Sequence, residues 1–110
     1  LLAERVRRVL DKQRAGNARG VVLVVEDLPE EREALAEILR MKGYVALTAG
    51  DGREALSLLR EPPRPGLIIL DVMMPGMDGW TVLTALRGDP ATAEIPVIMA
   101  TILDAAQHEQ

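Results

Sequence analysis

The chain has 110 residues, 48% of them hydrophobic, which is enough for one small domain with its own core. It has no cysteine and no phenylalanine, one tryptophan and one tyrosine, so disulfide and thiolate chemistry are excluded and the core must be aliphatic. The net charge of the chain is −4, and it is unevenly spread: residues 1–20 hold six Lys/Arg and two acids, whereas the remaining residues are acidic. An acidic body makes nucleic acid an unexpected partner.

Nothing in the sequence has the pattern of a membrane or secretory segment. The apolar runs are far shorter than the roughly 20 residues that a membrane helix needs. Charged residues throughout positions 1–14 argue against a signal peptide there. Because the lack of cysteine also fits a reducing compartment, we expect a cytoplasmic protein without a membrane span.

The first predicted element is an amphipathic helix over residues 1–14, followed by a linker, AGNARG, at residues 15–20. The helix is indicated by apolar residues at helical spacing, namely Leu2, Val6, Val9 and Leu10. From residue 21 onward the chain alternates between strand and helix patterns. Short apolar runs typical of strands in a parallel sheet occupy residues 21–25, 44–48, 67–70 and 96–100.

The three segments between these strands are predicted to be helices. Pro29 suits the first turn of the first helix, and Asp51 suits the N-cap of the second. Each segment carries an apolar stripe at helical spacing. The stripes are Leu35, Ile38 and Leu39 in the first, Ala55, Leu56 and Leu59 in the second, and Trp80, Val82, Leu83 and Leu86 in the third.

This alternation predicts an α/β fold, a doubly wound parallel sheet with helices on both faces and right-handed crossovers. In the flavodoxin-like strand order 2-1-3-4-5, the first and third strands are neighbours where the order reverses, and sites form outside their carboxyl ends. Glu26 and Asp27 end the first strand, Asp71 ends the third, and Thr101 follows the fourth. We therefore expect three carboxylates and a hydroxyl in one crevice.

Three close carboxylates raise one another's pKa, and a divalent cation relieves their repulsion. A set of oxygen ligands alone favours magnesium, Mg²⁺. A carboxylate beside Mg²⁺ can act as a nucleophile toward a phosphoryl group. The metal and the Thr101 hydroxyl would then share the charge on the oxygens of the transferred group.

Three stretches carry a resemblance to a known family: VVLVVEDLPEEREALAEILRMKGY, LIILDVMMPGMDGW and IPVIMATILD resemble the receiver (CheY-like) domain of two-component response regulators. The resemblance runs from about Val21 to the C-terminus. It implies a signalling phosphoacceptor, not an enzyme, that receives a phosphoryl group from the phosphohistidine of a histidine kinase or a histidine phosphotransfer protein. The residue roles that it implies are acceptor for Asp71, direct Mg²⁺ ligand for Asp27, water-mediated ligand for Glu26, ligand through the backbone carbonyl for Met73, and switch hydroxyl for Thr101.

Two departures from the family pattern stand out. The family more often has Asp at the position of Glu26. Receivers also have a fifth strand that ends in a lysine, whereas the only lysines of this chain are Lys12 and Lys42. We therefore expect residues 21–110 to be a C-terminally incomplete receiver without strand five. The alternative function is a degenerate receiver that serves only as a protein–protein docking module. A phosphatase with an aspartyl nucleophile is disfavoured, because such enzymes commonly carry a second acid where Met73 stands here.

Residues 1–20 are expected to be a helix and linker that reach in from an upstream module. LLAERVRRVL looks like the last helix of another receiver or a signalling helix from a kinase core, and the remaining interpretation is an ordinary amphipathic helix lying on the domain. The parent is expected to be a multidomain protein such as a hybrid histidine kinase. Further predicted partners are a tandem receiver, an output module and a second copy of the chain.

Overall fold

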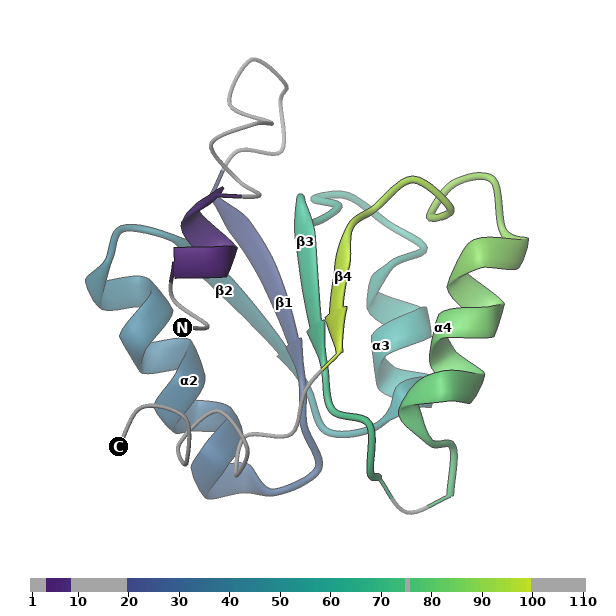
Figure 1. Cartoon of the computed structure of the whole chain (residues 1–110), viewed down its shortest axis with the longest axis horizontal. Coiled ribbons are helices and arrows are strands. Elements are labelled where there is room, and N and C mark those ends of the chain that lie inside the picture. Colours follow the sequence, from purple (N-terminus) through teal and green to yellow (C-terminus); the bar gives the residue numbers. More distant parts are fainter. Residues whose placement is uncertain (1–3, 9–19, 75, 100–110) are drawn as a thin grey trace.

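The computed structural model describes residues 4–8, 20–74 and 76–99. Four parallel strands form one sheet in the order β2-β1-β3-β4. In chain order the elements are β1 (Val21–Val25), α2 (Pro29–Met41), β2 (Val45–Ala49), α3 (Gly52–Leu58), β3 (Leu67–Leu70), α4 (Gly79–Gly88) and β4 (Val97–Met99). Figure 1 shows α2 on one face of the sheet and α3 and α4 on the other. The predicted doubly wound fold and the order 2-1-3-4 of its first four strands are confirmed.

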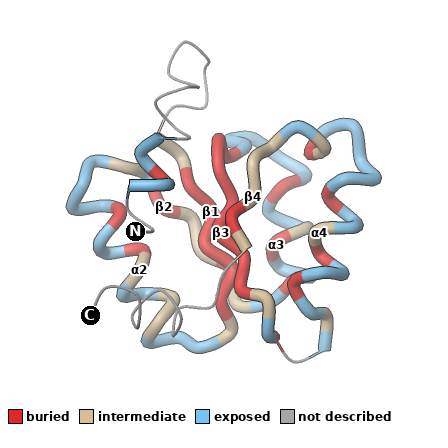
Figure 2. Tube along the Cα trace, in the orientation of Figure 1, coloured by how far each residue is buried: buried red, intermediate tan, exposed pale blue. Residues whose placement is uncertain are grey.

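The core consists of two hydrophobic clusters, one on each face of the sheet. Alternate residues of β1 enter different clusters: Val22 and Val24 face α2, whereas Leu23 and Val25 face α3 and α4. All four residues of β3 are buried in the same two-sided way. Figure 2 shows the two central strands as the most buried part of the trace. Burial on both faces explains why these strands read as continuous apolar runs.

The predicted helix starts are largely confirmed. Pro29 occupies the first turn of α2, where its missing N–H is not needed. Asp51 caps α3, its Oδ1 accepting a hydrogen bond from the Glu54 N–H at 2.8 Å. Asp78 caps α4 in the same way, accepting from the Thr81 N–H at 2.8 Å. Each helix therefore begins where the sequence provides a capping or first-turn residue.

Two residues assigned to apolar stripes do not face the core. Ile38 of α2 is 48% exposed and Trp80 of α4 is 59% exposed. Each lies two positions from a residue that is fully buried, Ala36 and Val82 respectively. Two positions are about 200° around a helix, so both side chains point away from the sheet. In both helices, fewer residues of the apolar stripe are buried than the sequence pattern predicts.

Residues 4–8 are helical and lie on the α2 face of the sheet. Val6 is only 1% exposed and belongs to the cluster that contains Val22, Ala36 and Leu39. This packing agrees with the interpretation of residues 1–14 as an amphipathic helix that lies on the domain. The described residues do not include Leu2, Val9, Leu10 or residues 15–19 of the proposed linker. The upstream module stays a prediction.

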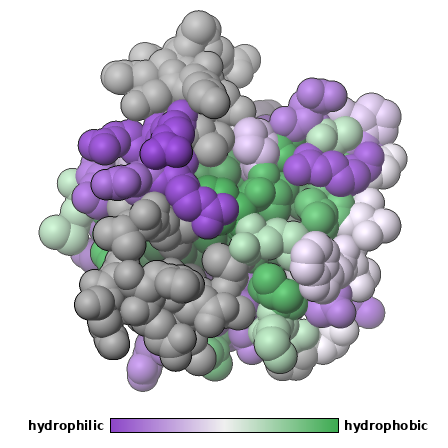
Figure 3. Space-filling model, viewed as in Figure 1, coloured by the Kyte–Doolittle hydropathy of each residue, from purple (hydrophilic) through white to green (hydrophobic). Residues whose placement is uncertain are grey.

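The predicted fourth strand, residues 96–100, starts one residue later than expected: β4 begins at Val97 and is described as far as Met99. Among the described strands it pairs with β3 alone. Figure 3, in the orientation of Figure 1, shows hydrophobic surface in the middle of the molecule. No described helix is long and apolar enough to cross a membrane.

Candidate functional site

The carboxyl ends of β1 and β3 lie side by side, with Val25 opposite Leu70. The ladder of hydrogen bonds continues one residue past each strand. The Asp71 N–H donates to the Val25 carbonyl at 3.0 Å, and the Glu26 N–H donates to the Ala49 carbonyl of β2 at 3.1 Å. The backbone of both acidic residues is therefore fixed by the sheet itself.

The three predicted carboxylates converge. Glu26, Asp27 and Asp71 each offer an oxygen, and these oxygens lie within 4.8 Å of one another. Glu26 is 2% exposed and Asp71 is 7% exposed, whereas Asp27 is half-buried. The expected convergence of the three carboxylates at the point where strand order reverses is confirmed.

The hydrogen bonds of Glu26 and Asp71 leave one buried oxygen without a partner. The Glu26 Oε1 accepts from the Leu28 N–H at 3.4 Å, and the Asp71 Oδ1 accepts from the Met73 N–H at 3.2 Å. The Glu26 Oε2 is buried and has no hydrogen-bond partner among the described residues. An orphaned carboxylate oxygen inside an acidic cluster is a favourable ligand for a cation, since a cation supplies the missing partner.

The same environment raises the pKa of Glu26 to about 8. Burial is the largest cause, because it penalises the charged form. The Asp71 carboxylate is the next cause, since it can accept the Glu26 proton and repels the Glu26 charge. In the metal-free protein the charged form of Glu26 is therefore disfavoured, and a bound cation would favour it.

The turn after β3 returns the chain directly beside Asp71. Met74 is buried in the core cluster of the α3 and α4 face, whereas Met73 is 75% exposed. The start of α4 approaches so closely that a Cβ on Gly79 would contact the Asp71 carbonyl oxygen and lie 2.9 Å from the Val72 Cα. Only glycine fits there.

The sequence analysis assigned no role to Gly79. The distance in sequence between Asp71 and Gly79 does not reveal that Gly79 lies against the Asp71 backbone, because that contact depends on how α4 packs on the sheet. Thr101, the predicted switch hydroxyl, lies outside the described residues. Met73 lies at the site through its N–H, and its predicted role as a carbonyl ligand stays a prediction.

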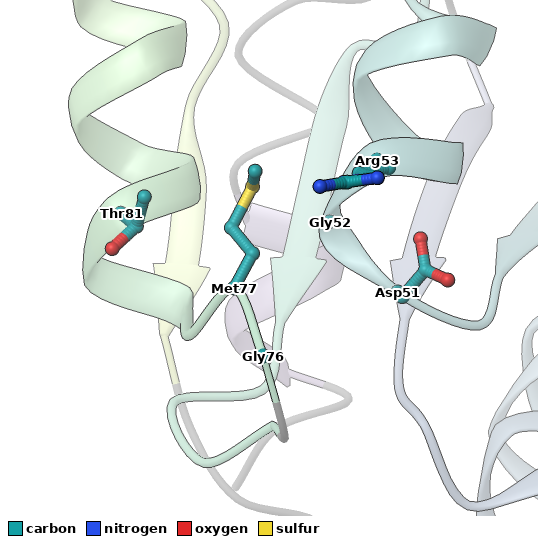
Figure 4. A pocket seen from close by; sticks show the side chains of 6 residues that line it. All are labelled: Asp51, Gly52, Arg53, Gly76, Met77 and Thr81. Carbon is teal, nitrogen blue, oxygen red and sulfur yellow. The ribbon is translucent and has the colours of Figure 1, made fainter.

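A separate hollow of about 460 Å³ lies between the start of α3 and the turn before α4. Figure 4 shows the Met77 side chain between the two helices, with Arg53 and Asp51 at the α3 edge. The lining residues are Asp51, Gly52, Arg53, Gly76, Met77 and Thr81. Its carboxylate is already engaged in capping α3. The convergent acids, and not this hollow, hold the groups suited to cation binding and phosphoryl chemistry.

A doubly wound parallel sheet with an acidic cluster at its switch point defines a small α/β domain that can hold a divalent cation beside a carboxylate. Residues 22–110 match the response regulator receiver domain, and the chain belongs to this family. The resemblance found in the sequence is thus confirmed. The chain is a receiver domain of two-component signalling.

Individual relatives agree with this assignment. Over 83 residues the chain is 45% identical to the response regulator PleD of Caulobacter vibrioides, a match that covers 76% of this chain and 18% of PleD. The signal receiver domain of a signal transduction histidine kinase from Syntrophus aciditrophicus is 39% identical, with a TM-score of 0.68 over 83% of this chain and 71% of that one. The Mn²⁺-bound form of the response regulator Rcp1 is 31% identical, with a TM-score of 0.67 over 74% of this chain and 65% of that one.

Proposed function

We propose that Asp71 accepts a phosphoryl group from the phosphohistidine of a histidine kinase or histidine phosphotransfer protein, and that the modified domain presents a changed surface to its partner. The observation that carries the proposal is the buried cluster of Glu26, Asp27 and Asp71, in which the Glu26 Oε2 lacks a hydrogen-bond partner among the described residues. No described feature favours the alternative of a docking module without phosphorylation, since the acidic cluster is complete.

Asp71 is suited to the nucleophilic role by the way it is held. Its backbone is fixed by the Val25 carbonyl, and its Oδ1 accepts from the Met73 N–H. This leaves Oδ2 as the attacking oxygen. An O–P bond forms at Oδ2 as the P–N bond of the phosphohistidine breaks, and the bonding electron pair leaves with the imidazole nitrogen.

The cation that fits the cluster is Mg²⁺, because the donors are all oxygens. Asp27 and Asp71 would bind it directly, Glu26 through water and Met73 through its backbone carbonyl. When bound, Mg²⁺ neutralises the carboxylates and the phosphoryl oxygens. The Mn²⁺-bound form of the relative Rcp1 supports a divalent cation in this kind of domain. Thr101 is proposed as the hydroxyl that moves toward the phosphoryl group.

We further propose that the domain acts as a phosphoacceptor and not as an enzyme with a separate substrate. Its proposed setting is the cytoplasm, as part of a multidomain signalling protein such as a hybrid histidine kinase. The chain spans about a fifth of the length of PleD. A receiver domain of a histidine kinase is among its structural relatives, which supports this setting. A tandem receiver or an output module would then be a neighbour in the same chain.

Incubation with acetyl phosphate and Mg²⁺, followed by intact mass measurement, tests the acceptor. We expect wild type to gain one phosphoryl group and Asp71→Asn to gain none, because an amide oxygen is a poor nucleophile. Asp51→Asn, which alters an exposed capping aspartate outside the cluster, serves as the control and should be labelled like wild type. No mass gain in wild type, or equal gain in Asp71→Asn, would show that the acceptor is wrongly assigned.

A further inference from the structure

Glu26 is held in place at three of its atoms. Its N–H donates to the Ala49 carbonyl of β2, and its Oε1 accepts from the Leu28 N–H. Its backbone carbonyl accepts from Nη1 of Arg32, a side chain of α2, at 3.0 Å. The third contact is the only one of these that comes from another side chain. Arg32 therefore helps to hold the backbone from which the Glu26 side chain extends.

The guanidinium of Arg32 also lies against the end of β2. A Cβ added to Gly50 would lie 3.1 Å from Arg32 Nη1 and 3.7 Å from its Cζ. The Gly50 N–H in turn donates to Glu54 Oε2 at 3.2 Å. Arg32 thus joins α2, the end of β1 and the end of β2 at the point where the acidic cluster begins.

Arg32 acts on the cluster through the backbone. Its hydrogen bond goes to a carbonyl oxygen, which leaves the carboxylates of Glu26, Asp27 and Asp71 free to face a cation. An arginine that bonded a carboxylate directly would compete with that cation for its ligand. In the actual arrangement Nη1 bonds the Glu26 carbonyl and also lies close to Gly50.

We propose that Arg32 is a positioning residue for the metal site: it fixes the Glu26 backbone, and so sets how well the Glu26 side chain is placed for Mg²⁺. The proposal rests on the proposed function, because it assumes that the cluster binds Mg²⁺. Outer partners that orient metal ligands are typically worth about 10- to 100-fold in affinity.

A purely structural role is the competing explanation, and Arg40 provides a matched control. Arg40 lies in the last turn of the same helix, and its Nη2 donates to the Ala46 carbonyl of β2 at 2.9 Å. Both arginines therefore tie α2 to the sheet through one backbone carbonyl. Ala46 pairs with Val22 near the amino end of β1, at the end of the sheet opposite to the acidic cluster.

The experiment is titration of the metal-free protein with MgCl₂ by calorimetry, together with thermal unfolding, for wild type, Arg32→Met and Arg40→Met. We expect Arg32→Met to weaken Mg²⁺ binding about tenfold and Arg40→Met to leave it within about twofold, although both lose thermal stability. Phosphorylation of Arg32→Met by acetyl phosphate should need about tenfold more Mg²⁺ for half-maximal rate but reach the wild-type rate at saturation, because Asp71 is unchanged.

Wild-type affinity in Arg32→Met, or equal weakening in Arg40→Met, overturns the positioning role. If wild type itself does not bind Mg²⁺, the proposed metal site fails and this inference fails with it. If Arg32→Met does not fold, Gly50→Ala decides, because its methyl group would lie 3.1 Å from Nη1 and make the guanidinium shift by a few tenths of an ångström without removing the charge. Weaker Mg²⁺ binding in Gly50→Ala supports the proposal, and unchanged binding overturns it.

Discussion

Among single residues, Glu26 couples the stability of the metal-free protein to pH. Its pKa is raised from an ordinary value of 4.5 to about 8 in the folded state. Between these values the unfolded chain has lost the Glu26 proton and the folded chain still holds it. The stabilisation that this proton provides is fully present below about pH 4.5 and is lost as the pH rises toward 8.

We therefore expect the free energy of unfolding of the metal-free protein to fall between about pH 5 and pH 8, by at most about 1.4 kcal/mol per pH unit, the value for one proton. Urea denaturation at a series of pH values measures this slope. Glu26→Gln should flatten it, because an amide does not titrate. Excess Mg²⁺ should also flatten it, since the cation binds the ionised form. A slope that survives in Glu26→Gln would assign the effect to another group.

Gly79 permits the close approach between α4 and the backbone of Asp71. Gly79→Ala places a methyl group against the Asp71 carbonyl and the Val72 Cα, neither of which can move without shifting the sheet or the turn. We expect a loss of about 1–3 kcal/mol in unfolding free energy and slower phosphorylation by acetyl phosphate. Gly88→Ala is the control, because a Cβ there meets nothing within 4 Å. Equal effects of the two substitutions in urea denaturation would contradict this account.

At the scale of elements, residues 4–8 belong to the folded domain. Val6 is buried against strands and α2, whereas Arg7 on the same turn is exposed. We expect Val6→Ala to cost about 1–3 kcal/mol, from lost transfer energy and the cavity left behind. Arg7→Ala should stay within about 0.5 kcal/mol of wild type. Thermal unfolding of the two variants checks the difference, and a neutral Val6→Ala would mean that this helix does not pack on the sheet in solution.

Local chemistry explains which elements could be predicted from the sequence. Strand runs, the first turn at Pro29 and the cap at Asp51 are properties of a few neighbouring residues, and all of them are present in the structure. The convergence of Glu26, Asp27 and Asp71 was also predictable, because strand order fixes which carboxyl ends meet.

Features that depend on packing were not predictable in this way. The exposure of Trp80 follows from the angle at which α4 meets the sheet, which no periodicity specifies. The close approach at Gly79 and the bond from Arg32 to the Glu26 carbonyl depend on how helices dock. A glycine in a turn and an arginine in a helix are too common in sequences for either role to be recognised before the tertiary contacts are known.

At the scale of the whole molecule, the isolated chain of 110 residues is expected to associate. Among the described strands, β4 pairs on one side only, and its Val97 and Met99 are partly exposed. An unblunted apolar edge strand favours pairing with another chain. Removing residues 1–16 should strengthen association, because it uncovers the cluster around Val6.

Sedimentation of the 110-residue chain, with and without residues 1–16, measures this directly. We expect the average mass to rise with concentration in both cases and more steeply for the shorter chain. A monodisperse monomer in both chains would rule out both the edge and the uncovered face as association surfaces.

The backbone bonds that continue the ladder into Glu26 and Asp71 have a consequence for how a signal leaves the site. Amide hydrogens held in this way exchange with solvent only when the centre of the sheet opens, so we expect these two to be among the slowest in hydrogen exchange. The proposed acceptor, Asp71, is thus anchored to the central strands of the sheet. A group added to it changes the forces on its neighbours without moving the acceptor itself. If Asp71 is phosphorylated as proposed, we therefore expect the displacement to appear in the turn that follows β3 and in α4, which rests on the Asp71 backbone at Gly79.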